Sequence, residues 1–173
     1  QQFDNSLAMN LPYLPIKKLR CQLDRALGAK LNFYKAWNPE GEAHITVITP
    51  IEYWDVLRKH LTMPEIDAIA LKNGLQKSDL KFEDIGSGKA TLDGKSEETY
   101  FLIVQSKNLL AIRRAINREF IKKGGDATAF SPDTFYPHIT IGYTRRDLHI
   151  TDGIIKDAAH SLDKRFDLFT NRP

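Results

Sequence analysis

Two stretches of this chain, EAHITVITP at residues 42–50 and FYPHITIGYT at residues 135–144, indicate its fold and its chemistry. Each contains the tripeptide His-Ile-Thr inside a run of apolar and β-branched residues. Alternate side chains of an extended strand share a face, so the histidine and threonine point one way and the isoleucines the other. The polar residues are His44 and Thr46 in the first stretch, and His138 and Thr140 in the second.

The two tripeptides match what a site for in-line displacement at phosphorus needs. Two imidazoles can act as general base and general acid, because the ordinary histidine pKa of about 6.5 lies close to working pH. Two hydroxyl groups can donate hydrogen bonds to the non-bridging phosphate oxygens. The second histidine follows the first by 94 residues, which is a domain-scale distance. The pattern therefore predicts two strands that meet across one cleft.

A third His-Ile-Thr, at residues 149–151, tests whether the tripeptide is sufficient by itself. Arg146 and Asp147 precede it, and Asp152 and Gly153 follow it. These residues are typical of turns and helix caps, and they do not form the apolar alternation of a half-buried strand. We therefore interpret His149 as structural. The signal is the tripeptide on a strand with an apolar opposite face, present twice.

The paired motifs resemble the 2H phosphoesterase superfamily, which includes 2′,3′-cyclic phosphodiesterases and 2′,5′ RNA ligase-like proteins. Pro137 before the second histidine also fits the resemblance. It implies an α+β fold in which residues 1–173 form a single bilobal domain. Two antiparallel sheets with pseudo-twofold symmetry would surround a central cleft, with helices on the outer faces. The mixture of helical and strand patterns along the chain also favours an α+β domain.

The resemblance also implies an activity and roles for the residues. His44 and His138 would be the general acid and base, and Thr46 and Thr140 would bind phosphate oxygens. The expected reaction is hydrolysis of the 2′,3′-cyclic phosphate of a nucleotide or an RNA end, with no metal and no cofactor. The sequence leaves open which histidine is the acid.

Two tyrosines near the second motif are candidate substrate-binding residues. Tyr136 precedes His138 by two residues, so strand periodicity places it on the same face, where it could stack a base or line the cleft. Tyr143 falls on the opposite face unless Gly142 bends the strand. On the helix expected over residues 108–123, basic residues form one face, for which solvation or contact with RNA are the alternatives. They are Arg113, Arg114, Arg118, Lys122 and Lys123.

Periodicity and turn residues predict the other elements. Helices are expected over residues 15–31, 53–61, from Pro64 to about residue 70, and over 108–123. Strands are expected over residues 33–37, 42–49, 80–85 and 135–144. A hairpin is expected to join residues 90–92 to 99–104 through Asp93 and Gly94.

Composition limits the protein class without deciding it. The 173 residues are 42% hydrophobic and 27% charged, with a net charge of +3 at pH 7. That charge suits a phosphate-bearing ligand and is far from that of a protein that binds duplex DNA. We expect no membrane partner and a monomer. The one cysteine, Cys21, favours the cytoplasm, whereas a first residue other than Met allows a processed or secreted chain, so localisation stays open.

Two other functions remain open at the level of sequence. The same cleft could hold a nucleotide or another phosphate ligand without turnover, as a binding module. Alternatively, the chain could be a scaffold or secreted structural protein whose histidines no longer act. Binding without product formation would indicate the module, and neither binding nor turnover would indicate the scaffold.

Overall fold

In the computed structural model, which describes residues 5–167, the chain divides into two compact units. The described part of the first unit comprises residues 5–9, 46–81 and 106–135. The second comprises residues 10–45, 82–105 and 136–167. Both units therefore combine segments that are distant in sequence.

The strands form one five-stranded sheet in the order β1-β2-β5-β4-β3. Strand β5 is antiparallel to both β2 and β4. The bounds are Leu7–Leu11 for β1, Ala43–Ile48 for β2, Lys81–Leu92 for β3, Lys95–Gln105 for β4 and His138–Tyr143 for β5. The α+β class is confirmed. The expectation of two sheets is corrected within residues 5–167, because the two His-Ile-Thr strands are direct neighbours in a single sheet. The pseudo-twofold symmetry stays a prediction.

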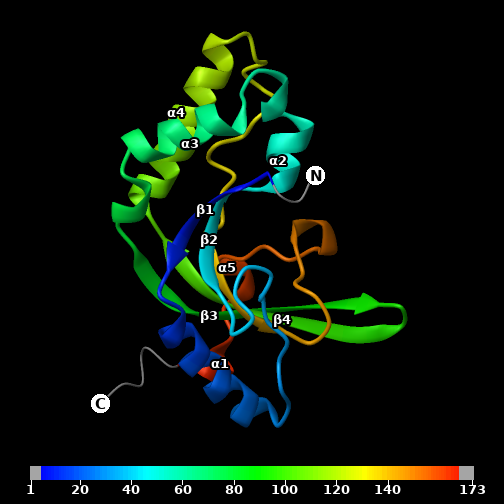
Figure 1. The fold of residues 1–173 in the computed structure, drawn as a ribbon. Coiled ribbons are helices and arrows are strands. Elements are labelled where there is room, and N and C mark those ends of the chain that lie inside the picture. Colours follow the sequence, from blue (N-terminus) through cyan, green and yellow to red (C-terminus); the bar gives the residue numbers. More distant parts are fainter. Residues whose placement is uncertain (1–4, 168–173) are drawn as a thin grey trace. The chain divides into compact units, whose positions relative to one another are not determined.

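The hairpin of β3 and β4 is the longest strand pair and extends well away from β5 (Figure 1). Asp93 and Gly94 form its two-residue turn, with φ of 50° and 78°. A two-residue hairpin turn with both φ values positive favours Asp or Asn followed by Gly, and this sequence has that pair. The hairpin predicted at Asp93 and Gly94 is confirmed, although its strands are longer than expected.

The first unit is mainly helical. It contains α2 (Pro50–Asp55), α3 (Met63–Lys72) and α4 (Lys107–Lys122), with short 3₁₀ turns at Leu57–Lys59 and Leu75–Lys77. Helices α3 and α4 lie side by side (Figure 1). The apolar stripe predicted for α4 is buried, at Leu109, Ile112, Ile116 and Phe120. The side chains of Thr49 and Thr62 cap α2 and α3, each in a capping box with a glutamate three residues later.

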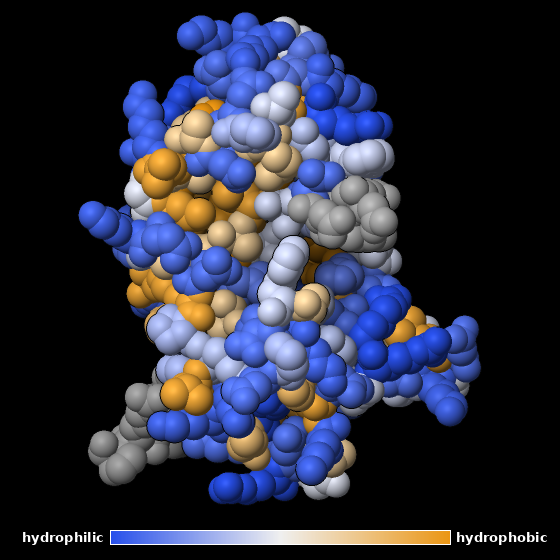
Figure 2. Space-filling view, in the orientation of Figure 1, coloured by the Kyte–Doolittle hydropathy of each residue, from blue (hydrophilic) through white to orange (hydrophobic). Residues whose placement is uncertain are grey.

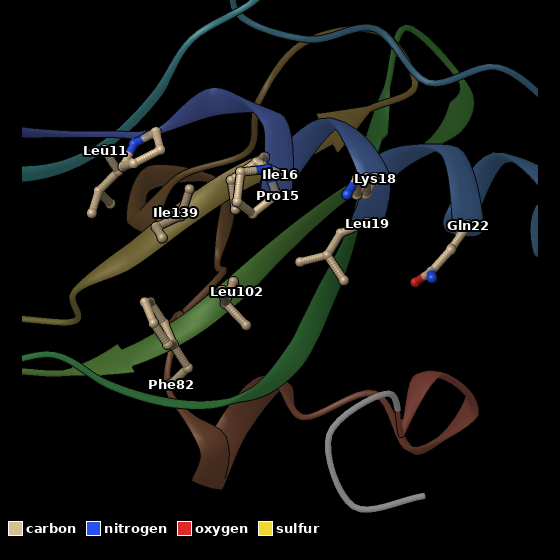
Figure 3. A pocket seen from close by; sticks show the side chains of 10 residues that line it. Leu11, Pro15, Ile16, Lys18, Leu19, Gln22, Phe82, Leu102 and Ile139 are labelled. Atoms are coloured by element: carbon tan, nitrogen blue, oxygen red, sulfur yellow. The ribbon is translucent and has the colours of Figure 1, made fainter. Parts of the chain in front are cut away.

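In the second unit, α1 (Tyr13–Leu27) runs along one face of the sheet, and Ile16, Leu19, Leu102 and Ile139 project into the space between them (Figure 3). Helix α1 ends at Gly28, whose φ of 66° is the left-handed conformation that glycine favours at a helix end. The unit ends with α5 (Ala158–Ser161) and 3₁₀ turns at Ile150–Asp152 and Lys164–Phe166. The other face of the sheet is therefore the one that can carry the polar residues of both motifs.

Charged and polar residues predominate on the face shown in Figure 2, with hydrophobic residues in separate patches. Trp37, Leu14 and Leu71 are among the large hydrophobic side chains that are exposed. Within the described part of the chain, no helix has the length and apolar character needed to cross a bilayer.

Candidate functional site

Each His-Ile-Thr motif occupies the predicted strand and shows the predicted alternation. On β2, Ala43, Ile45 and Val47 are buried, whereas His44 and Thr46 are half-buried. On β5, Ile139 and Ile141 are buried, whereas His138 and Thr140 are half-buried. The histidine and threonine of each strand thus share the less buried face, as strand periodicity requires.

The pairing of Ile45 with Ile139 places the two motifs on neighbouring strands. Moving one residue along each antiparallel strand puts His44 opposite Thr140, on the face away from the paired isoleucines. His138 is then a diagonal neighbour of His44, an arrangement in which the Cα atoms lie about 7–8 Å apart and the Cβ atoms somewhat closer. Two imidazoles at that separation can reach one phosphate group from either side. Thr46 follows His44 by two residues on β2 and belongs to the first unit.

A β-bulge turns the end of β5 and changes which side chains share the histidine face. Tyr100 pairs with Gly142 but Phe101 pairs with Thr140, so Ile141 is an extra residue in the β5 strand. A bulge shifts the alternation by one residue, so Tyr143 returns to the side of Thr140. The sequence predicted that Tyr143 would face away from His138 unless the strand bends near Gly142. The bulge provides that bend, so Tyr143 shares the face of the histidines.

The segment around residue 32 brings a further tyrosine to this face. Asn32 and Tyr143 exchange two backbone hydrogen bonds, of 2.8 and 2.9 Å, where the sequence predicted a longer strand over residues 33–37. The Tyr34 ring then packs against two rings at centroid distances of 5.8 Å from His44 and 5.5 Å from Tyr143. The rings of Tyr34 and Tyr143 thus form an aromatic cluster with His44, the first histidine.

The His138 ring is held in a defined orientation. Its Nδ1 lies 2.8 Å from the backbone oxygen of Tyr136, and a carbonyl oxygen can only accept a hydrogen bond. Nδ1 therefore carries the proton, and in the neutral ring Nε2 keeps its lone pair. The Phe101 ring packs against the imidazole in a T-shaped arrangement, at a centroid distance of 5.8 Å. Phe101 belongs to a hydrophobic cluster with Ile103, Leu148 and Ile154.

Tyr136 is placed differently from the expectation. Strand β5 begins at His138, so Tyr136 precedes the strand and the periodicity argument for its side chain does not apply. Its backbone oxygen fixes the tautomer of His138, and its side chain is half-buried. A substrate-binding role for the Tyr136 ring stays a prediction.

The carboxylate of Asp147 lies next to the second motif and accepts hydrogen bonds from four side chains. The hydroxyl groups of Thr99, Thr140 and Tyr34 donate to its carboxylate, the last two at 3.1 and 3.2 Å. The ammonium group of Lys156 lies 3.0 and 3.2 Å from the two carboxylate oxygens. Asp147 and Lys156 form a buried ion pair, with side chains 5% and 4% exposed. The hydroxyl proton of Thr140 is directed at Asp147 in this arrangement.

These groups set the protonation of the two histidines differently. Burial, and then the positive charge of Lys156, lower the pKa of His138 to about 3. Burial also lowers the pKa of His44, but there the carboxylates of Glu42 and Asp147 act in the opposite direction. Glu42 lies 3.9 Å from Nδ1 of His44. Among their charged neighbours, the carboxylate of Glu42 has the largest effect on the pKa of His44, and the ammonium group of Lys156 has the largest effect on that of His138.

The ionised state of Asp147 follows from its neighbours. Burial raises the pKa of this carboxyl group, but the charge of Lys156 and the hydrogen bond from Thr99 outweigh it, and the net shift is downward. Burial, followed by the negative charge of Asp147, raises the pKa of Tyr34 far above its usual value. Tyr34 is therefore a hydrogen-bond donor at any working pH.

The third His-Ile-Thr lies in a capped turn, as the residues around it predicted. His149 is the N-cap residue of the 3₁₀ turn Ile150–Asp152, and its backbone N–H donates to the Asp152 carboxylate. Arg146 forms a two-bond ion pair with the same carboxylate, and Arg145 pairs with Asp93 of the hairpin turn. The carboxylates neutralise both arginines.

The basic face expected on α4 is corrected at Arg113. This side chain is 1% exposed, because it turns inward to form an ion pair with Glu52 and donates to the backbone oxygens of Val47 and Ser131. Arg114 pairs with the exposed Asp133. Arg113 therefore supports the first unit and does not form part of a solvated basic surface.

An apolar cavity of about 530 Å³ lies on the opposite face of the sheet, between α1 and the strands (Figure 3). Ile139 and Leu102 contribute to its lining, with Phe82 and residues of α1. Because Ile139 points away from His138 and Thr140, this cavity is separate from the histidine face.

The sequence interpretation missed Tyr34, Thr99, Asp147 and Lys156. Asp147 and Lys156 follow the second motif in irregular segments, where periodicity gives no information about side-chain direction. A weak signal existed at Thr99, since it is a β-branched polar residue directly before the apolar run at residues 100–104. In the described residues, no group of three or more His, Cys, Asp or Glu side chains lies together as metal ligands do.

Comparison with known families gives a match to one domain family. The family model 2H-SAK, described as "Swiss Army Knife, 2H phosphoesterase domain", matches residues 5–149. The match includes both strand motifs and Asp147, and it ends before Lys156. Searches of curated proteins and of solved structures found no match to the chain.

Proposed function

The chain belongs to the 2H phosphoesterase family, and on that premise we propose that it hydrolyses 2′,3′-cyclic phosphates of nucleotides or RNA ends by two-histidine acid/base catalysis. The family supports an enzyme of the phosphoesterase kind that acts on a nucleotide or RNA substrate. The cyclic substrate and the roles of individual residues are our proposals.

The observation that carries the proposal is the pairing of β2 with β5 at Ile45 and Ile139. It puts His44 and His138 on one face of neighbouring strands, at a diagonal spacing of about 7–8 Å. A cyclic phosphate between the rings would have one imidazole on the side of the attacking water and the other on the side of the leaving oxygen.

The surroundings of the two histidines assign their roles in the proposal. His138 is neutral and has its lone pair on Nε2, so it is the general base. It would take a proton from water as the water oxygen bonds to phosphorus. His44, beside Glu42, would be the general acid and would give its proton to the ribose oxygen as the ester bond breaks. The product is a phosphate monoester, and each histidine contributes about 10²–10⁴ to the rate.

Thr46 and Thr140 would stabilise the negative charge that develops on the non-bridging oxygens. The hydroxyl of Thr140 now donates to Asp147 at 3.1 Å, so it must rotate toward the phosphate when substrate binds. In this aromatic cluster, the rings of Tyr34 and Tyr143 would offer a surface beside His44 where a base or ribose could pack.

The same hydrogen bond from Thr140 to Asp147 also favours a second candidate function. A site whose hydroxyl and Nε2 atoms already face protein groups could hold a phosphate ligand without turning it over. In that case the chain would be a nucleotide- or phosphate-binding module.

Incubation of the purified chain with a 2′,3′-cyclic nucleotide, and calorimetry with AMP, distinguish the two functions. Release of a monoester supports the enzyme. Tight binding with no product on any cyclic nucleotide or 2′,5′-linked substrate supports the module and overturns the proposed hydrolysis.

A further inference from the structure

We propose that Lys156 is a positioning residue, which keeps His138 in its neutral form protonated at Nδ1, and that Asp147 holds Lys156 in place. This role rests on the proposed function, since it acts through the histidine assigned as general base. Lys156 lies beyond residues 5–149, so the family match does not include it.

The contact between the two side chains is direct. Nζ of Lys156 lies 3.5 Å from Nε2 of His138, the nitrogen that keeps its lone pair. The opposite ring nitrogen is fixed by the backbone oxygen of Tyr136 at 2.8 Å. Protonation of Nε2 would therefore place the positive charge of the imidazolium next to the ammonium group of Lys156. The repulsion between these two charges disfavours the protonated form of His138.

Asp147 explains why Lys156 remains a cation in a buried position. Its two oxygens lie 3.0 and 3.2 Å from Nζ, and their charge raises the pKa of Lys156 while burial, the larger effect, lowers it. The hydroxyl groups of Thr99 and Tyr34 donate to the same carboxylate and hold it against movement toward His138. The ammonium group is thus fixed between the carboxylate and the imidazole.

Among the described residues, the charged or titratable groups with the largest effects on the pKa of His138 are Lys156, Asp147 and His149. Lys156 disfavours its protonation, Asp147 favours it, and His149 disfavours it more weakly. The hydrophobic cluster with Phe101 adds the desolvation that is the largest influence. Lys156 is the charged group whose contact with a ring nitrogen is seen directly, so its removal is the change that tests the role.

The test is an NMR titration of the His138 ring nitrogens in the wild type, in Lys156→Met and in the double variant Asp147→Asn/Lys156→Met. The double variant removes both charges together, because Lys156→Met alone leaves a buried carboxylate that could unfold the protein. We expect the His138 pKa to rise by about one unit or more in Lys156→Met, and by less in the double variant, which also loses the Asp147 charge. The exposed Lys164→Met serves as the matched control.

A His138 pKa that stays at the wild-type value in a folded Lys156→Met overturns the proposal, and so does an equal rise in Lys164→Met. If Lys156→Met does not fold, the double variant decides, and a His138 pKa there that equals the wild-type value overturns the role. The titration needs no turnover, so failure of the proposed hydrolysis would be seen separately. Where turnover is present, the acidic limb of kcat/KM should move to higher pH in Lys156→Met, because the base must be neutral to act.

Discussion

Ile45 of β2 pairs with Ile139 of β5 in an antiparallel register. The two buried isoleucines are the centres of the two His-Ile-Thr motifs, and their pairing sends all the polar neighbours to the other face of the sheet. A shift of the register by one residue would reverse this for one of the strands. The relationship between these two residues therefore underlies the proposed site.

The assignment of His44 as acid and His138 as base predicts a difference between their variants. His44→Ala should reduce kcat/KM for a 2′,3′-cyclic nucleotide by about 10²–10⁴, and a nitrophenyl phosphodiester should restore most of the rate because nitrophenolate leaves without a proton. His138→Ala should lose a similar factor on both substrates. The exposed His160→Ala is the control. Rescue of His138→Ala alone would reverse the assignment.

The two threonine hydroxyls are expected to stabilise the transition state. Thr46→Val and Thr140→Val should each lower kcat by about 10²–10³, as loss of one oxyanion donor does, whereas Thr140→Ser should retain most activity. Thr151→Val, in the third His-Ile-Thr, is the matched control and should be as active as the wild type. Full activity of Thr140→Val in a steady-state assay would exclude its hydroxyl from the reaction.

The buried ion pair predicts a large effect on stability. Asp147→Ala leaves the Lys156 ammonium without its carboxylate, which should lower the free energy of unfolding by about 3–5 kcal/mol. Asp133→Ala breaks the exposed pair with Arg114 and should lower the free energy of unfolding far less, because solvent screens an exposed ion pair. Urea unfolding of both variants measures the difference. Equal losses would show that the Asp147 pair is no more important than a surface contact.

The lowered pKa of His138 predicts how stability depends on pH. The folded protein keeps this ring neutral to about pH 3, whereas the unfolded chain protonates it near the ordinary value of about 6.5. Its contribution is complete above about pH 6.5 and is lost as the pH falls, by up to about 1.4 kcal/mol per unit. Urea unfolding at pH 7 and pH 5 should show a loss about 2 kcal/mol smaller in His138→Asn than in the wild type. The same loss in both proteins would contradict the shift.

The sequence predicted the parts of the fold that local patterns control. The two motif strands, the hairpin at Asp93 and Gly94, and helix α4 all follow from alternation, turn residues or an apolar stripe. Strand β1 was missed because its five residues are too few for a clear pattern. The single sheet was also missed, since the pairing of β2 with β5 is a long-range contact that neither strand encodes alone.

In the candidate site too, local sequence patterns predicted the strand residues but not the long-range contacts. Periodicity placed His44, Thr46, His138 and Thr140 on the correct faces of their strands. It could not place Tyr143, because the bulge at Ile141 shifts the alternation, and it could not find the ion pair beneath His138. Asp147 and Lys156 come together only when the irregular chain after β5 folds back. Patterns in sequence describe regular elements, and the polar contacts that set protonation lie outside them.

The measurement that tests the central claim most directly compares the wild type with His44→Ala/His138→Ala on a 2′,3′-cyclic nucleotide, with product followed by ³¹P NMR. We expect the wild type to convert the cyclic phosphate to a monoester, and the folded double variant to show no turnover above the uncatalysed background. Equal turnover by the two proteins, or no turnover by the wild type on any cyclic nucleotide or 2′,5′-linked substrate, would contradict two-histidine phosphodiester hydrolysis.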